Sequence, residues 1–115
     1  MEASISHISI IVKSDASVDF YSTLGFKEIK RIIRHNDNVV LMEGNGIGLE
    51  IFIDPRHPER ATEPESCGLR YFSIKVDDFD EVTKCFDCGT IKTDWFGKRY
   101  YFISDPDGLP IQLHE

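Results

Sequence analysis

The sequence lacks any hydrophobic run long enough to cross a lipid bilayer. A membrane-spanning helix needs about 20 consecutive apolar residues, and charged residues, which make up 29% of the 115 positions, interrupt every apolar stretch before that length. The N-terminus, MEASISHISI, has no basic segment ahead of an apolar stretch, so it is not typical of a signal peptide. We therefore expect a cytoplasmic protein with no membrane partner.

Basic residues are also scarce. Thirteen Lys and Arg stand against 20 Asp and Glu, which gives a formal net charge of −7. Such a balance repels polyanions on average, and the basic residues form only two small groups, Arg31–Arg34 and Lys98-Arg99. We expect no nucleic-acid partner.

Cysteine is limited to Cys67, Cys85 and Cys88, which cannot all pair within one chain. The Cys85-x-x-Cys88 spacing suggests a zinc or redox site. However, no second CxxC or pair of histidines completes a zinc set, and no strand and loop precede the motif as a redox site requires. We favour the interpretation that Cys85 and Cys88 are small, buried or partly buried residues of an amphipathic helix.

Three of the five prolines fall within residues 54–67, which are otherwise rich in charge. Proline removes a backbone donor and fixes φ, so this segment is predicted to be a linker or surface loop. It separates a first module, residues 4–53, from a second, residues 68–115. At this length the whole chain, 1–115, is predicted to be one domain.

Each module shows the same order of elements. Helical spacing of Val18, Tyr21 and Leu24 predicts a helix that Gly25 ends, and the equivalent second helix is predicted to end at Gly89. Ser14 and Asp15 are candidate caps of the first helix, and Asp77 or Asp78 of the second. Periodicity and β-branched residues predict strands at 5–12, 26–34, 39–42, 49–53, 69–76, 90–95, 99–104 and 109–113.

The two modules are related by an internal repeat. Ser9 matches Ser73 and Gly25 matches Gly89 at an offset of 64 (73 − 9 = 64), and near the end Glu50 matches Gln112 at an offset of 62 (112 − 50 = 62). The chain is therefore predicted to be an α+β protein of tandem βαβββ modules. One module is too small to bury both faces of its sheet. We expect the two mixed sheets to form a shared cleft, within one chain or between swapped chains.

A polar residue interrupts an apolar strand at equivalent places in both copies. His7 and Glu50 do so in the first copy, and Tyr71 and Gln112 in the second. Strand residues alternate between faces, so Glu50 points away from its neighbours Leu49 and Ile51. An isolated Glu in such a strand usually faces solvent, but its recurrence in both copies favours a functional cleft.

These features resemble the vicinal oxygen chelate superfamily, which includes glyoxalase I, extradiol dioxygenases, fosfomycin-resistance transferases and bleomycin-binding proteins. The likeness is greatest to small bacterial glyoxalase-like members, through Pro58-Glu59-Arg60 and Cys67–Arg70. It covers nearly the whole chain. The other matching segments are His7–Ile10, Phe20–Phe26, Leu49–Phe52, Gly68–Phe72, Val76–Asp78 and Asp105–Leu113.

The resemblance implies a metal site built from two side chains of each copy, usually His and Glu. His7 and Glu50 match the first pair, and Gln112 matches a glutamine that serves as a ligand in some glyoxalase I enzymes. Tyr71 departs from the pattern, since a phenol with a pKa of about 10 offers only a weak neutral oxygen at neutral pH. Imidazole and carboxylate suit Zn²⁺, Ni²⁺ or Mn²⁺, which we expect to bind weakly or not at all.

Two functions remain open at this point. The first is a glyoxalase- or bleomycin-resistance-like protein that binds a small molecule in an aromatic cleft, its metal site eroded. Plain core or dimer packing is the competing explanation for the aromatic residues. The residues expected to form this substrate cleft are Tyr71, Trp95, Arg99, Tyr100 and Phe102, with Arg99 meeting an anionic group.

The second function is a metal-dependent lyase or isomerase of the lactoylglutathione lyase type. In that case Glu50 is the catalytic residue that moves a proton, and a divalent metal polarises the substrate oxygen. A regulatory protein without a ligand is a third class. In every case the resemblance implies a homodimer.

Overall fold

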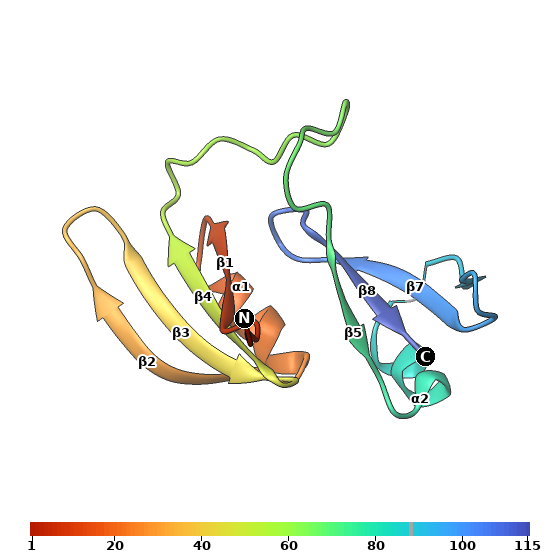
Figure 1. The fold of residues 1–115 in the computed structure, drawn as a ribbon. Coiled ribbons are helices and arrows are strands. Elements are labelled where there is room, and N and C mark those ends of the chain that lie inside the picture. Colours follow the sequence, from red (N-terminus) through yellow and green to blue (C-terminus); the bar gives the residue numbers. More distant parts are fainter. Residues whose placement is uncertain (88) are drawn as a thin grey trace. The chain divides into compact units, whose positions relative to one another are not determined.

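The computed structural model describes residues 1–87 and 89–115, and it divides the chain into two compact units (Figure 1). Unit 1 comprises Met1–Glu59 and unit 2 comprises Arg60–Glu115, so the boundary falls inside the predicted linker. Each unit holds one helix and one four-stranded mixed sheet. The predicted α+β class and tandem βαβββ order are confirmed.

Unit 1 contains one parallel and two antiparallel strand pairs. β1 runs parallel to β4, and the sheet order is β1-β4-β3-β2. β2 is therefore an edge strand, and all its residues are exposed. The elements are β1 (His7–Val12), α1 (Ala16–Thr23), β2 (Lys27–Ile33), β3 (Asn38–Gly44) and β4 (Ile47–Ile53).

The core of unit 1 lies on the face of the sheet that α1 covers (Figure 1). Val12, Leu49 and Ile51 from β1 and β4 are almost fully buried, and Tyr21 of α1 is fully buried. The ring of Tyr21 meets the ring of Phe26 edge to face, at 6.1 Å between centroids. One face of the sheet is thereby used for packing, and the opposite face carries both polar and apolar side chains.

The ends of α1 largely match the predicted signals. Ser14 accepts a hydrogen bond from the backbone N–H of Ala16 at 3.2 Å. Asp15 occupies the N-cap position but makes no capping bond, because its carboxylate pairs with Arg31. Gly25 follows the helix with φ of +95°, a conformation that disfavours residues with a Cβ atom.

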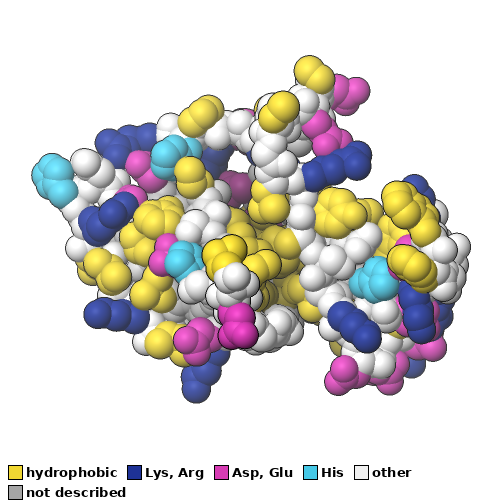
Figure 2. All heavy atoms as spheres, viewed as in Figure 1, with side chains coloured by type: hydrophobic (Ala, Val, Ile, Leu, Met, Phe, Trp, Pro, Cys, Tyr) yellow, Lys and Arg dark blue, Asp and Glu magenta, His cyan; other side chains and the backbone are white. Residues whose placement is uncertain are grey.

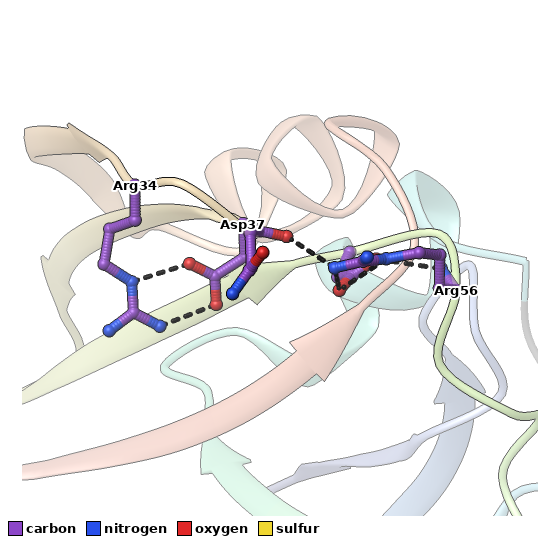
Figure 3. Close-up of polar contacts among 5 residues, drawn as sticks. Arg34, Asp37 and Arg56 are labelled. Atoms are coloured by element: carbon purple, nitrogen blue, oxygen red, sulfur yellow. Dashed lines mark hydrogen bonds and ion pairs between the residues drawn. The ribbon is translucent and has the colours of Figure 1, made fainter.

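A group of charged residues holds the turn between β2 and β3 (Figure 3). Arg34 donates two hydrogen bonds of 2.6 Å to the carboxylate of Asp37. Arg56 donates to the backbone oxygen of Asn36 at 2.9 Å and to the carboxylate of Asp54. These contacts lower the pKa values of Asp37 and Asp54, chiefly through the arginine side-chain hydrogen bonds. The turn is thereby tied to the segment that follows β4.

Unit 2 repeats the plan with shorter elements. β5 runs parallel to β8, and the sheet order is β5-β8-β7-β6. Ile74, Tyr101, Ile111 and Leu113 form its core together with Phe79 of α2. The elements are β5 (Phe72–Lys75), α2 (Phe79–Cys85), β6 (Lys92–Thr93), β7 (Arg99–Ser104) and β8 (Pro110–His114).

Two expectations for the second helix were wrong. α2 ends at Cys85 rather than at Gly89, because Phe86 already has extended backbone angles, φ −121° and ψ 138°. Cys85 is exposed rather than buried or partly buried, since the short helix turns only its Phe79 end into the core. The expectation for Cys88 lies outside the described residues.

Two strands of unit 2 are also shorter than predicted. β5 begins at Phe72, and Leu69 before it is about half exposed. β6 stops at Thr93 because the Asp94 carboxylate accepts the backbone N–H groups of Phe96 and Lys98 and turns the chain.

In the part of the chain that the structure describes, no helix has the length and apolar character to cross a membrane.

Candidate functional site

The open face of unit 1 carries His7 and Glu50 in contact with each other. The parallel pairing of β1 and β4 sets Ser9 opposite Glu50, and strand alternation sends Leu49 and Ile51 into the core. Ser9 Oγ donates to Glu50 Oε2 at 3.1 Å, and His7 Nε2 lies 3.4 Å from the same oxygen. A carboxylate is therefore held between a hydroxyl and an imidazole at a partly exposed position.

A hollow of about 610 Å³ adjoins this pair within unit 1. Its wall includes His7 and Glu50 together with the glycine-containing turn between β3 and β4. The hollow is thus polar at the pair and gives a small molecule or solvent access to the Glu50 carboxylate.

Unit 2 builds the equivalent contact from different side chains. The pairing of β5 and β8 sets Ser73 opposite Gln112, and Ser73 Oγ donates to Gln112 Oε1 at 2.7 Å. Ser9 and Ser73 are equivalent in the repeat, as are Glu50 and Gln112. The duplication therefore extends to the hydrogen bond itself. The repeat identified both serines, but nothing in the sequence assigned them a role in the site.

A second hollow, of about 580 Å³, lies within unit 2. This volume is in the range of small-molecule sites, roughly 300–1,000 Å³. Four of the five residues expected to form the substrate cleft are in its wall. The lining residues are Arg60, Ala61, Thr62, Glu65, Arg70, Tyr71, Trp95, Tyr100, Phe102, Ser104, Pro110 and Gln112.

Aromatic rings form one side of the unit 2 hollow. The ring of Phe102 meets Tyr71 at 4.8 Å and Tyr100 at 5.9 Å, both edge to face. Trp95 is 97% exposed, and Phe102 is 38% exposed. These rings therefore present apolar area to a ligand instead of burying it in the core.

The turn that carries Trp95 is fixed by a contact that sequence reasoning missed. Asp94 Oδ1 accepts the N–H groups of Phe96 and Lys98, and Asp94 Oδ2 lies 2.7 Å from His114 Nε2. The His114 ring in turn stacks on Tyr100. The backbone bond from Lys98 is the main reason that the pKa of Asp94 is lowered. The run Asp94–Gly97 is a recognisable turn signal, but nothing in the sequence pairs it with His114.

Arg99, expected to meet an anionic group, lies elsewhere in unit 2. Its guanidinium pairs with Asp80 at 2.8 Å and with Glu115 at 3.0 Å, and it stacks over the ring of Phe79 at 4.7 Å. The two carboxylates already neutralise its charge. Arg60 is the arginine that lines the hollow without a carboxylate partner among the described residues, and the sequence pattern did not single it out as a ligand.

The donor atoms do not fit a tightly held divalent ion. His7 and Glu50 supply one imidazole and one carboxylate, while Gln112 engages its amide oxygen with Ser73 and Tyr71 offers a phenol oxygen. No cluster of three or more His, Cys, Asp or Glu side chains suited to a metal occurs among residues 1–87 and 89–115. In unit 1, His7 and Glu50 bring together two donors of the kinds that suit such an ion.

Two bacterial proteins are similar to this chain over almost their whole length. The Escherichia coli K12 protein YaeR, which is uncharacterized, is 38% identical over 96% of this chain and 95% of its own. The uncharacterized protein YwkD of Bacillus subtilis 168 is 36% identical over 97% of this chain and 96% of its own. These relatives are small proteins of the same size class, so the likeness is not limited to one segment.

Solved structures agree with this likeness. A glyoxalase family protein from Enterococcus faecalis superposes with a TM-score of 0.89 at 34% identity, over 97% of each chain. A lactoylglutathione lyase from Agrobacterium tumefaciens superposes with a TM-score of 0.69 at 20% identity, over 100% of this chain and 95% of its own, which shows the fold alone.

A family model also matches nearly the entire sequence. Residues 4–113 fit the Glyoxalase/Bleomycin resistance protein/Dioxygenase superfamily. The match spans both units and includes His7, Glu50, Tyr71 and Gln112. With the repeated βαβββ units, the paired serines and the similar glyoxalase family structure, it establishes that the chain belongs to the Glyoxalase/Bleomycin resistance protein/Dioxygenase superfamily.

Proposed function

We propose that this protein binds a small organic molecule in the cleft predicted from the duplication, and that its metal-ligand set is eroded. The observation that carries the proposal is the unit 2 hollow, where Tyr71, Tyr100 and Phe102 stand beside the amide of Gln112. Apolar walls with a few polar anchors are typical of small-molecule sites. The aromatic rings supply contact area, and the polar groups orient the ligand.

We further propose that His7 and Glu50 are the first module's contribution to that cleft. Supporting this, the Glu50 carboxylate faces away from the core although both of its strand neighbours are buried. Ser9 fixes the carboxylate and His7 lies beside it, so the pair is suited to accept a hydrogen bond or a proton from a ligand.

A metal-dependent lyase of the lactoylglutathione lyase type is the second candidate. It is favoured by the contact between His7 and Glu50, which are the two residues that match the metal ligands of relatives. In this function Glu50 is the proton-transferring residue. Formation of lactoylglutathione from the hemithioacetal of methylglyoxal and glutathione, lost in Glu50→Gln, is the assay that supports it.

We also propose that the protein is a cytoplasmic homodimer. Hydrophobic side chains reach the surface of both units (Figure 2). Ile11 and Ile33 of unit 1 and Phe96 of unit 2 are 58%, 81% and 88% exposed. Contiguous exposed apolar patches mark protein interfaces, and we propose that these side chains contribute to one.

Saturation-transfer NMR against a library of small molecules tests the binding function. The wild-type protein is expected to bind one or more compounds, and Ser104→Trp, which places a large ring in the wall of the hollow, to lose them. Ser4→Trp adds the same ring at an exposed N-terminal position and should retain binding. Equal binding by the wild type and Ser104→Trp, or no binding by the wild type, contradicts the proposal.

A further inference from the structure

We propose that the unit 2 hollow selects a planar aromatic carboxylate, with its ring against Trp95 and its anionic group on Arg60 and Gln112. This inference rests on the proposed small-molecule binding and names the class of ligand. It follows from three features of the hollow: an arginine with no anionic partner in the part of the chain that the structure describes, an amide with N–H donors, and an exposed indole ring.

The charge of Arg60 is not neutralised within the described residues. Its Nη2 donates to the backbone oxygens of Leu69 and Arg70 at 2.9 and 3.0 Å, and no carboxylate of the described chain lies within ion-pair distance. A guanidinium has five N–H donors, so the other nitrogens remain available to a ligand. The two carbonyls hold the side chain in place, which reduces the entropy lost when an anion binds.

Arg70, the other arginine of the hollow, is in a different situation. Its guanidinium binds the carboxylate of Glu65 at 2.9 and 3.2 Å, and this bond raises the pKa of Arg70. Thr62 and Glu65 form an isolated β-bridge in the same loop. Arg70 therefore holds the loop in shape, whereas Arg60 gives the hollow its uncompensated positive charge.

This local charge is opposite in sign to that of the protein. The hollow contains two arginines and one glutamate, while the chain as a whole carries a net charge of −7. A small anion would be repelled by the molecule on average, so its binding requires a specific positive group. Charge-assisted hydrogen bonds from a guanidinium to a carboxylate supply that group.

Gln112 offers the hollow hydrogen-bond donors. Its Oε1 accepts the hydrogen bond from Ser73 at 2.7 Å, and its amide N–H₂ carries two donors for a ligand. Gln112 is only 9% exposed, and that exposed part faces the hollow. Arg60 and Gln112 thus both donate hydrogen bonds, which favours an oxyanion over a cation.

Trp95 provides the surface for an aromatic ring. Its indole is 97% exposed, yet Asp94 and His114 hold the turn that carries it. An aromatic ligand gains offset stacking against such a ring beyond the area it buries. An aliphatic anion would gain the charge contact but not the stacking.

Three probes separate the two contacts: 2-naphthoate carries the ring and the anion, 2-naphthamide the ring alone, and cyclohexanecarboxylate the anion alone. We expect 2-naphthoate to bind at least about 10-fold more tightly than 2-naphthamide, because only the naphthoate makes a charge-assisted hydrogen bond. It should also bind about five-fold more tightly than cyclohexanecarboxylate, because only the naphthoate stacks on the indole ring. Isothermal titration calorimetry measures all three affinities.

Arg60→Gln is expected to bind 2-naphthoate and 2-naphthamide equally, because it removes the charge and leaves the ring contact. Arg34→Gln is the control, since Arg34 pairs with Asp37 in unit 1. Trp95→Phe should weaken both naphthyl probes by a similar factor. Circular dichroism confirms that each variant is folded.

Preference for 2-naphthoate that persists in Arg60→Gln overturns the assignment of Arg60. If none of the three probes binds while the NMR screen finds other ligands that Ser104→Trp loses, the ligand class is wrong and the binding function stands. If nothing binds in either experiment, both proposals fail.

Discussion

Ser9 and Ser73 hydrogen bond the side chains that lie opposite them in their sheets, Glu50 and Gln112. The sequence predicted that Glu50 points away from the core, because alternation along a strand follows directly from backbone geometry. It did not predict the role of the serines, since a hydroxyl contact depends on the register between distant strands. The direction of a site side chain is thus predictable from the sequence when it depends on one strand alone. A contact between side chains is not predictable when it depends on how two distant strands pair.

Replacing Ser73 by Ala should weaken binding of 2-naphthoate about five-fold. The variant removes the bond that turns the amide of Gln112, and a hydrogen bond of this kind contributes about 1 kcal/mol. Calorimetric titration checks the value. Ser22→Ala is a matched control, because it also loses one side-chain hydrogen bond, from Ser22 Oγ to the oxygen of Val18. Unchanged affinity in Ser73→Ala would show that the serine does not orient the amide.

Glu115 makes stability depend on pH in the acid range. The side-chain hydrogen bond with Arg99, followed by the backbone N–H of that residue, lowers the pKa of Glu115 to about 2 from its usual 4.5. A carboxyl whose pKa is lower in the folded state stabilises the protein above its unfolded pKa, and this contribution disappears as pH falls through the folded value. The loss therefore occurs between about pH 4.5 and pH 2.

Thermal unfolding of the wild type and Glu115→Gln from pH 6 to pH 2 tests this effect. At pH 6 the wild type should have the higher Tm, and the difference should shrink as the pH falls below about 4.5. Asp37, Asp54 and Asp94 titrate in both proteins, so the difference isolates Glu115. A gap in Tm that stays constant over the range would contradict the pKa shift.

At the scale of elements, the sequence predicted the order of strands and helices better than their ends. The first helix ends where expected because Gly25 adopts a positive φ. The second helix ends early, since Phe86 takes an extended conformation that no local sequence signal predicts. β6 is cut short by the Asp94 turn and Leu69 is left outside β5. Local signals decide such ends only when no side-chain contact competes.

The N-terminus of α2 should depend on one capping residue. Asp78 accepts the N–H of Glu81 at 3.1 Å, and the loss of such a cap costs about 1 kcal/mol. We expect Asp78→Ala to lower the free energy of unfolding by that amount in urea denaturation. Asp77→Ala removes the same charge one residue earlier and should lower the free energy of unfolding by less than half as much. Equal losses in the two variants would assign the effect to charge and not to capping.

At the scale of the molecule, the internal repeat predicted two similar units, and the structure contains them. The boundary after Glu59 lies inside the proline-rich segment, because that segment has little apolar surface to bury. The family match explains why the likeness covers both halves. The identity of the ligand does not follow from the fold, since the same fold supports many functions. It depends on the particular side chains of the site.

The exposed apolar residues predict self-association of the whole chain. Sedimentation velocity at micromolar concentration should show a homodimer, and substitution of the exposed Ile33 by Asp should shift the distribution toward the monomer. Lys30→Asp, which introduces the same carboxylate at an exposed polar position of the same strand, serves as the control. A wild-type protein that sediments as a stable monomer would contradict the dimer.

The proposed function requires a cleft that binds an organic molecule without a complete metal site. The metal content of the protein tests this requirement. The protein is expressed with Ni²⁺, Mn²⁺ and Zn²⁺, dialysed, and then measured by elemental analysis. We expect well below one equivalent of metal per chain, because the described donors include one imidazole and one carboxylate in contact, with a phenol at Tyr71 and an amide at Gln112. One full equivalent, lost in His7→Ala, would contradict the account and favour the metal-dependent lyase.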